Sequence, residues 1–371
     1  MIDRRSFLAG GLGLAAACRP RRRGAGFPGY AFVANEEGQA IAAVDLTAFA
    51  VARHIPLGAN PTEVIAHPSR PSVFALTPRT GAVHEIDAGA LALGRKRVCA
   101  NAAVSMRLAP DARSLWVLAR EPRQLIRLGA ASLEVEARLP LAGEPKDFDI
   151  ARDGARAAVS FGPEGWLAIL NLETGKTEHG LRLGKALGAV RFQSNGRNLL
   201  AANLEDRMLT IADVASGRVV THLPLAVRPD NLCFNSDAGQ LFITGDGMDA
   251  VVIVYPYQTE VAETVLAGHA PGAMAASAAP GFLFVANPRS NSVTILDIET
   301  HKAIAAAPAG AEPGHITITP DNQYALVLNR RSGDMAVIRI AAVIAKRSRS
   351  APLFTMIPVG SKPVSATVRG V

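Results

Sequence analysis

Residues 30–35 read Tyr30-Ala31-Phe32-Val33-Ala34-Asn35, an apolar run that is closed by an asparagine. The closing position recurs every 42 residues as far as Asn329, without one insertion or deletion. Each member follows a short apolar run, and the set is Asn35, Thr77, Ala119, Phe161, Asn203, Gly245, Asn287 and Asn329. A repeat of about 20 to 50 residues is typical of solenoids, propellers and arrays, so this period decides the fold.

Two further registers with the same period mark turns. One follows the second apolar run of each unit and visits Asp45, Asp87, Gly129, Asn171, Asp213, Tyr255, Asp297 and Arg339. The other visits Ser69, Asp111, Asp153, Asn195, Asp237, Ala279 and Asp321. The apolar runs between them are short and rich in Val, Ile, Leu and Phe, which indicates strands separated by turns. No segment after residue 26 sustains a helical period.

One unit therefore contains four strands in about 40 residues, the size of one propeller blade, and ring closure hides the strand edges. The units predict eight blades, with seven as the alternative if one divergent unit is not a blade. The C-terminal segment from Thr355 to Val368 repeats the pattern of residues 55–66. We expect it to supply the inner strand that the first unit lacks and to pair with residues 31–35.

The repeat also resembles a known family. Residues 30–35, Phe284-Val285-Ala286-Asn287 with Val293-Thr294-Ile295-Leu296-Asp297, and residues 312–321 are similar to the YVTN-type propeller repeat of YncE-like and surface-layer proteins. The resemblance covers nearly all of residues 28–371. It implies an exported propeller that serves as a binding or interaction scaffold, and fold analogy alone does not define an activity. Ala119, Phe161 and Gly245 depart from the Asn of the repeat, so their blades are expected to carry features particular to this protein.

Residues 1–25 have the pattern of an export signal, and residues 26–371 form the predicted propeller. Arg4-Arg5-Ser6-Phe7-Leu8 precedes an Ala- and Leu-rich run that is too short for a permanent membrane helix. The paired arginines are similar to a twin-arginine signal. Cys18 follows Leu14-Ala15-Ala16-Ala17 and is a candidate for lipidation, with plain cleavage as the alternative. The sequence predicts a periplasmic or exported protein that meets the membrane only through its signal or a lipid anchor.

Charge and cysteine usage exclude several functions. Residues 1–23 hold six Arg and one Asp of a chain whose net charge is +7, so the propeller is nearly neutral. This argues against a nucleic-acid partner, which requires a concentrated basic face. The basic run Lys346-Arg347-Ser348-Arg349 lies in the one insertion and is interpreted as a solvated loop. Cys99 and Cys233 lie far apart in the repeat, so we predict no disulfide and inert, buried thiols.

The candidate binding residues lie where the inner strands begin, because these positions converge on one rim around the central channel. The second residue after the inner-strand Pro forms a ring of Glu63, Ser105, Asp147, Ala189, Asn231, Ala273, His315 and Ser365. The next residue along is apolar in every blade and should pack between blades. Glu63, Asp147, Asn231 and His315 suit a ligand or divalent-metal site. The structural alternative is that they satisfy backbone groups at their own strand ends.

Variable loops share this rim, and Trp166 in one of them suggests a protein, peptide or glycan partner. The hypothetical binding set is Glu63, Asp147, Asn231, His315, Trp166, Arg107 and Arg191. For the Asn set of the repeat, we favour a structural role. The opposite rim, with its regular Asp turns, is expected to be structural.

Three function classes remain open at this point. A non-enzymatic, monomeric binding scaffold is the preferred interpretation. The alternative is a catalytic or cofactor-handling propeller, similar to lactonases or to the haem-binding propellers of nitrite reductases. The chain lacks a nucleophile motif and a haem-attachment motif, and only His315 is a candidate axial ligand. We predict no cofactor, and leave a divalent metal or haem open. DNA binding comes third, because the aromatic content is only 5%.

Overall fold

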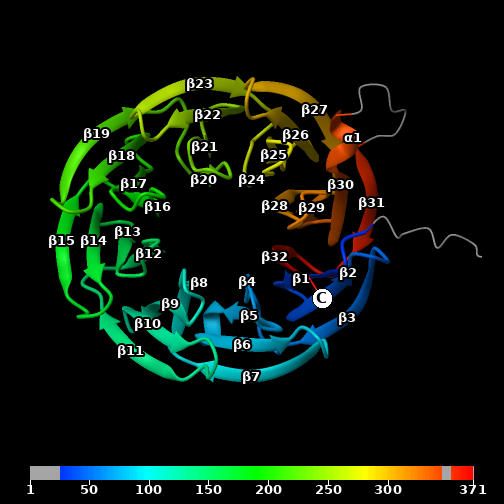
Figure 1. Cartoon of the computed structure of the whole chain (residues 1–371), viewed down its shortest axis with the longest axis horizontal. Coiled ribbons are helices and arrows are strands. Elements are labelled where there is room, and N and C mark those ends of the chain that lie inside the picture. Colours follow the sequence, from blue (N-terminus) through cyan, green and yellow to red (C-terminus); the bar gives the residue numbers. More distant parts are fainter. Residues whose placement is uncertain (1–25, 345–351, 371) are drawn as a thin grey trace, which may run out of the picture.

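The computed structural model describes residues 26–344 and 352–370. They form a closed ring of eight four-stranded antiparallel sheets around a central opening (Figure 1). The prediction of an eight-bladed propeller is confirmed. The export signal, Cys18 and the basic run at residues 346–349 lie outside the described residues. No described helix is long and apolar enough to cross a membrane.

Every blade runs from an inner strand at the channel to an outer strand at the rim of the disc. The first four blades consist of β32 (Pro363–Gly370), β1 (Gly29–Asn35), β2 (Ala40–Asp45) and β3 (Ala50–Pro56); β4 (Glu63–Ala66), β5 (Ser72–Thr77), β6 (Ala82–Asp87) and β7 (Ala92–Val98); β8 (Ala102–Leu108), β9 (Ser114–Glu121), β10 (Gln124–Gly129) and β11 (Val135–Pro140); and β12 (Pro145–Ile150), β13 (Arg156–Phe161), β14 (Trp166–Asn171) and β15 (Thr177–Arg182).

The second half of the ring repeats this order. Its blades consist of β16 (Leu187–Phe192), β17 (Asn198–Asn203), β18 (Met208–Asp213) and β19 (Arg218–Pro224); β20 (Asn231–Phe234), β21 (Leu241–Thr244), β22 (Ala250–Tyr255) and β23 (Glu260–Leu266); β24 (Met274–Ala276), β25 (Phe282–Asn287), β26 (Ser292–Asp297) and β27 (Lys302–Pro308); and β28 (Pro313–Ile318), β29 (Tyr324–Asn329), β30 (Asp334–Arg339) and β31 (Leu353–Pro358).

The C-terminal strand closes the ring. β32 pairs antiparallel with β1, with Tyr30 opposite Arg369 and Ala34 opposite Ser365. The first blade thus combines one C-terminal strand with three N-terminal strands, as the tail pattern predicts. With β32 in place, every blade has an inner strand, and the inner edge of β1 is not left unpaired.

The core lies between blades, where the faces of neighbouring sheets meet. Along each inner strand, alternate residues enter this core: the side chain of Phe148 is fully buried and that of Met106 is 3% exposed. The prediction that this register packs between blades is confirmed, although Leu232 and Met274 are only partly buried. The intervening residues of each inner strand are the ones that line the channel.

Two short helices interrupt the strand pattern. The 3₁₀ turn η1 (Pro78–Thr80) replaces a simple turn, and α1 (Ile340–Ile344) begins the insertion between β30 and β31. Neither contradicts the observation that no segment after residue 26 sustains a helical period. Each has five residues or fewer, which is too short for a helical period to show in a sequence.

Aspartates of the repeat form the turns on the rim where the inner strands end. Asp45 Oδ1 accepts a hydrogen bond from Thr47 N at 2.7 Å, and Asp87 Oδ1 accepts one from Gly89 N at 2.8 Å. Asp213 and Asp297 make the same kind of bond. These bonds satisfy the turn backbone and explain why the residue type repeats.

Candidate functional site

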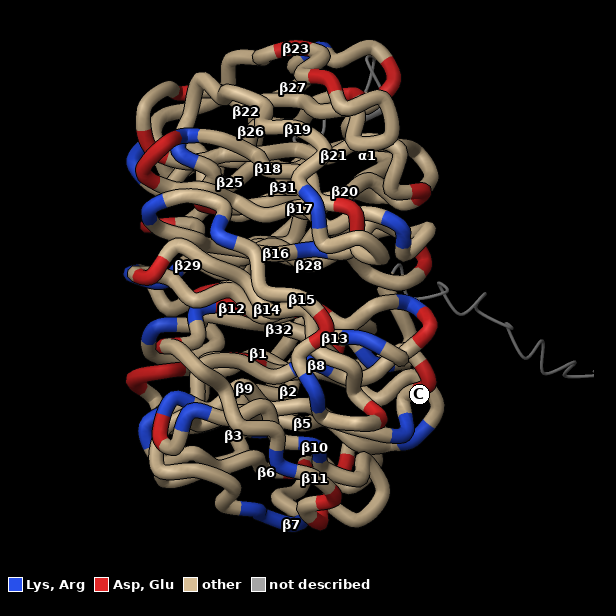
Figure 2. Tube along the Cα trace, turned by 90° about the vertical axis from the view of Figure 1, so that its left-hand side faces the viewer, with Lys and Arg blue, Asp and Glu red and all other residues tan. Residues whose placement is uncertain are grey.

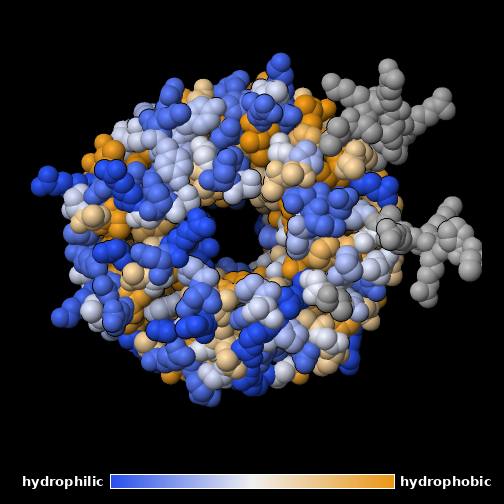
Figure 3. Space-filling model, viewed as in Figure 1, coloured by the Kyte–Doolittle hydropathy of each residue, from blue (hydrophilic) through white to orange (hydrophobic). Residues whose placement is uncertain are grey.

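The predicted ring residues lie on the rim where the inner strands begin, called here the start rim. Figure 3 shows that the disc is open at its centre, with hydrophilic and hydrophobic residues around the opening. Glu63, Asp147, Asn231 and His315 lie on β4, β12, β20 and β28, which are alternate blades of the ring. Asp147 and His315 are therefore on opposite sides of the channel, as are Glu63 and Asn231.

This spacing excludes a metal centre built from the four together. Among the described residues, no group of three or more His, Cys, Asp or Glu side chains could hold a metal ion. The described side chains therefore give no support to a divalent-metal site formed by these four residues. A quarter of the ring separates equivalent positions on alternate blades, and half of the ring separates Asp147 from His315.

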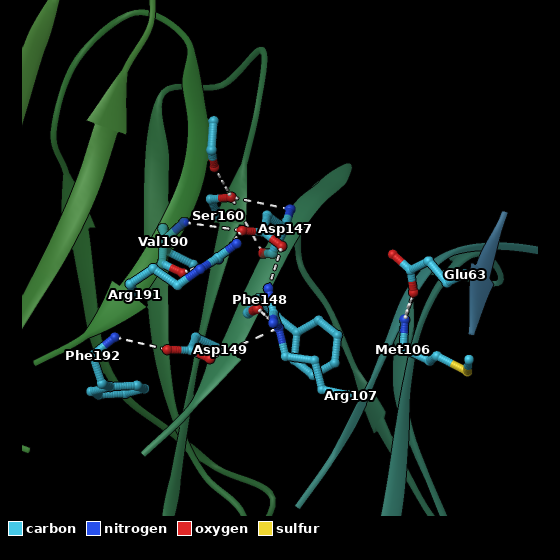
Figure 4. A network of polar contacts seen from close by, with 11 residues as sticks. Glu63, Met106, Arg107, Asp147, Phe148, Asp149, Ser160, Val190, Arg191 and Phe192 are labelled. Carbon is cyan, nitrogen blue, oxygen red and sulfur yellow. Dashed lines mark hydrogen bonds and ion pairs between the residues drawn. The ribbon is translucent and has the colours of Figure 1, made fainter. Parts of the chain in front are cut away.

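Glu63 and Asp147 hydrogen-bond to the next blade. Glu63 Oε2 accepts from Met106 N at 2.7 Å, and Asp147 Oδ2 accepts from Val190 N at 3.1 Å. Figure 4 shows both contacts. The structural alternative was thus right that these carboxylates satisfy backbone groups. It was wrong that the groups belong to their own strand ends.

Burial changes the proton affinity of Glu63. It raises the pKa of this carboxyl group to about 7, although the Met106 amide and the positive charge of Arg107 act in the opposite direction. The effect follows from the cost of an ionised carboxylate that is largely removed from water. Glu63 therefore exchanges a proton near neutral pH.

Asp147 is the centre of an ion-pair network on one wall of the channel. Arg191 Nη1 lies 2.5 Å from Asp147 Oδ2, and Arg107 Nη2 lies 3.3 Å from Asp147 Oδ1. Asp149 extends the network, with its Oδ1 3.8 Å from Arg107 Nε and its Oδ2 accepting from Phe192 N at 2.9 Å. The guanidinium of Arg107 also lies over the ring of Phe148. In Figure 4 these side chains converge between β8, β12 and β16.

Proton affinities within the network follow from its charges. Burial by itself would raise the pKa of Asp147, but Arg191 and Arg107 hold it below its usual value. Burial prevails for Asp149, whose pKa is raised. A buried carboxylate that pairs with two guanidiniums joins three blades, so Asp147 has a structural role.

His315 lies on the opposite wall in a different environment. Burial lowers its pKa to about 4, so the imidazole is neutral at physiological pH. Its Nε2 lies 3.3 Å from the carbonyl oxygen of Ala366, which requires the proton to be on Nε2. Nδ1 then carries a lone pair. It has no hydrogen-bond partner among the described residues, and it is not among the fully buried polar atoms that lack a partner. A backbone carbonyl on one ring nitrogen is the usual way in which a ligating histidine is oriented.

The side-chain amide of Asn231 is also available to a ligand. Its side-chain amide makes no hydrogen bond to the part of the chain that the structure describes, and it lines an open cavity of about 510 Å³ on the start rim. Gly245 lines the same cavity. A side chain at Gly245 would meet the carbonyl oxygen of Arg228, which explains why Asn is absent from this unit.

The repeated asparagines have the structural role that we favoured. Asn35 Nδ2 donates to the carbonyl oxygen of Val359 at 2.8 Å, and Asn203 Nδ2 donates to that of Leu183 at 3.1 Å. Asn287 and Asn329 bond to side chains within their own blades. Each holds the loop that enters or closes its blade.

Trp166 begins β14 and is partly buried against the core between the third and fourth blades. Its ring is stacked on Phe161 with a centroid distance of 4.4 Å. Phe161 thus replaces the repeated Asn with an aromatic packing partner. Only the remaining indole surface, beside Glu164, Gly180 and Arg182, is available to a partner.

Both propeller cysteines are free thiols, as predicted. Cys99 is buried and Cys233 is partly buried on β20, and burial raises both pKa values, to about 11 and about 12. Neither is a nucleophile at neutral pH.

Sequence reasoning named Arg107 and Arg191 but missed Asp149, Thr317 and Thr367, which lie at the same register of the inner strands. The signal was present, because these positions follow the predicted ring by two residues and must share its face of the strand. Five of the eight residues in that register are polar or charged, and this share could have identified it as a channel-facing position.

The fold and the channel define an eight-bladed β-propeller whose opening bears a charged wall and a neutral wall. No protein-family model matches the chain, and no curated protein does, so the YVTN resemblance gains no support from these comparisons.

Solved structures share the fold at low identity. A dihydro-haem d1 dehydrogenase, NirN in complex with DHE, is 16% identical with a TM-score of 0.75, over 91% of this chain and 75% of that one. Apo AztD from Citrobacter koseri is 13% identical with a TM-score of 0.71, over 93% and 99%. Hydrazine synthase from Kuenenia stuttgartiensis is 17% identical with a TM-score of 0.60, over 76% and 96%. At this identity, the likeness establishes the fold alone.

Proposed function

We propose that this protein is an exported ligand-binding propeller whose central channel, entered from the start rim, holds a small molecule against the wall formed by β20, β24 and β28. The observation that carries the proposal is His315, a neutral imidazole with one nitrogen oriented by the Ala366 carbonyl and the other free for a ligand. Asn231 adds a second unused polar group on this wall.

The charge distribution supports a small ligand in preference to a nucleic acid. Figure 2 shows Lys and Arg interspersed with Asp and Glu along the side of the disc that faces the viewer. The charged residues Glu63, Arg107, Asp147, Asp149 and Arg191 lie on the inner strands β4, β8, β12 and β16. We therefore retain a binding function, and keep catalysis and DNA binding as less supported alternatives.

The second candidate function is the handling of a metal-containing tetrapyrrole such as haem. The donor set of this wall fits: His315 Nδ1 is an imidazole ligand, and the ring positions of β20 and β28 carry no Asp or Glu that would repel anionic substituents. A bound haem would supply redox or ligand-binding chemistry at its iron. The similarity of the fold to a protein named as a dihydro-haem d1 dehydrogenase motivates this candidate and does not establish it.

The test is a titration of the purified propeller with iron protoporphyrin IX, followed by absorption spectroscopy. We expect a saturable shift of the Soret band in the wild type, and at least a tenfold loss of affinity with an altered spectrum in His315→Ala. His179→Ala, which removes a histidine on the outer strand β15, is the matched control and should bind normally. Equal spectra and affinities for wild type and His315→Ala would contradict the role of His315.

Export is proposed on the residues of the N-terminal segment. Replacing Arg4 and Arg5 by Lys should retain the protein in the cytoplasm, because the twin-arginine route requires the paired arginines. Cell fractionation with an antibody measures the distribution. A Cys18→Ala variant in the same experiment separates lipidation from plain cleavage. If Cys18 is normally lipidated, the substitution moves the protein out of the membrane fraction, and if the signal is simply cleaved, the distribution does not change. Normal export of the double-Lys variant would contradict the assignment.

A further inference from the structure

One hydrogen bond recurs between neighbouring inner strands. The channel-facing side chain of one blade accepts from a backbone amide of the next blade, as Glu63 does from Met106 and Asp147 from Val190. The same bond joins Ser365 Oγ to Val64 N at 3.3 Å and Thr367 Oγ1 to Ala66 N at 3.1 Å. Asp149 and Phe192 make it as well.

The bond exists because alternate amides of an inner strand point away from their own sheet. In β28, the amide that follows the strand, Thr319 N, donates to the carbonyl oxygen of Tyr324 in β29. The amides of Thr317 and His315, at steps of two residues from Thr319, therefore point to β29. The amides of Ile316 and Ile318 point to the preceding blade and the channel. A backbone amide that is removed from bulk water requires an acceptor.

Two alanines of the preceding blade leave the amides of Ile316 and Ile318 without a hydrogen-bond acceptor. The residues that should cap Ile316 N and Ile318 N are Ala273, just before β24, and Ala275 of β24, and an alanine side chain has no acceptor. No described side chain or carbonyl outside the strand ladder accepts from either amide. The ring positions of β20, β24 and β28 carry no Asp or Glu, so an anion meets no like charge on this wall.

We propose that the amides of Ile316 and Ile318 bind two acidic groups of the channel ligand. Amides two residues apart along a strand are separated by about 7 Å, too far for the two oxygens of one carboxylate. The geometry therefore selects a ligand with two acid substituents that lies beside His315. This inference deepens the proposed function and rests on it.

The decisive variant installs the cap that the alanines lack. Ala273→Ser with Ala275→Thr copies the pair Ser365 and Thr367, which caps Val64 and Ala66 in this same protein. The double variant should fold, because the added hydroxyls give the amides of Ile316 and Ile318 an acceptor. Its unfolding temperature should be equal to or above that of the wild type. Ala189→Ser is the matched control, since it places the same hydroxyl before Leu232 on another blade.

The probes are iron protoporphyrin IX, which has two acid groups, and its dimethyl ester, which has none. We expect the wild type to bind the acid at least tenfold more tightly than the ester. The double variant should lose at least tenfold in affinity for the acid and keep its affinity for the ester, and Ala189→Ser should behave as the wild type does.

Three outcomes would overturn the inference. If the double variant keeps the wild-type preference for the acid, then the amides do not bind the acid groups. If it loses both probes equally, the added side chains block the channel and the acids are bound elsewhere. If the wild type binds neither probe, the proposed tetrapyrrole ligand fails, and this inference fails with it.

Discussion

Deletion of residues 361–371 is expected to abolish the cooperative unfolding of the propeller. The deletion removes β32, which pairs with β1 along its length and places Ala366 in the core between the first and eighth blades. It exposes the backbone edge of β1 and opens the ring, so the loss should equal most of a folding stability of about 5–15 kcal/mol. Circular dichroism during thermal unfolding measures the effect.

A matched control keeps β32 and removes a single contact. Thr367→Val in the full chain deletes the hydrogen bond to Ala66 N and should lower the free energy of unfolding by about 1 kcal/mol. A peptide of residues 361–371 added to the truncated protein should restore a cooperative transition. A truncated protein that melts as the full chain does would show that β32 does not close the ring.

Asp147→Ala is expected to lower the free energy of unfolding by about 3–5 kcal/mol, the cost of leaving buried charges without their partner. Arg107 and Arg191 would lose their shared carboxylate, and Val190 N would lose its acceptor. Urea unfolding at neutral pH measures the change. Asp153→Ala, in an exposed turn, is the control and should cost less than about 1 kcal/mol.

The pH dependence of the same variant provides a second check. The pKa of Asp147 is lowered in the folded protein, so its contribution is present above the ordinary carboxyl value and is lost as the pH falls through the lowered value. The stability difference between wild type and Asp147→Ala should therefore shrink in acid. A difference that stays constant from neutral pH to pH 3, or a variant as stable as the wild type, would contradict the structural role of this carboxylate.

The fold could be predicted from the sequence because the repeat resides in residues that act within one blade. Asn35 and Asp45 satisfy backbone groups of their own turns and loops, so their spacing is inherited by every unit. The closing strand could be predicted for the same reason, since the segment around Pro363 has the pattern of an inner strand.

The site could be predicted only in part. The register placed Glu63, Asp147, Asn231 and His315 on the start rim, but their hydrogen-bond partners lie on neighbouring blades, and a within-blade repeat contains no information on those contacts. Asp147 therefore seemed free to bind a ligand, whereas it neutralises two guanidiniums. The uncapped amides of Ile316 and Ile318 depend on alanines of another blade, and became visible only when adjacent inner strands were seen together.

The most direct measurement of the central claim is a crystal structure of the propeller with iron protoporphyrin IX bound. Our account predicts the ligand in the channel at the start rim, with the iron on His315 Nδ1 and the two acid groups beside the amides of Ile316 and Ile318. A ligand on the outer strands, or one seated in the channel without contact to His315, would contradict it.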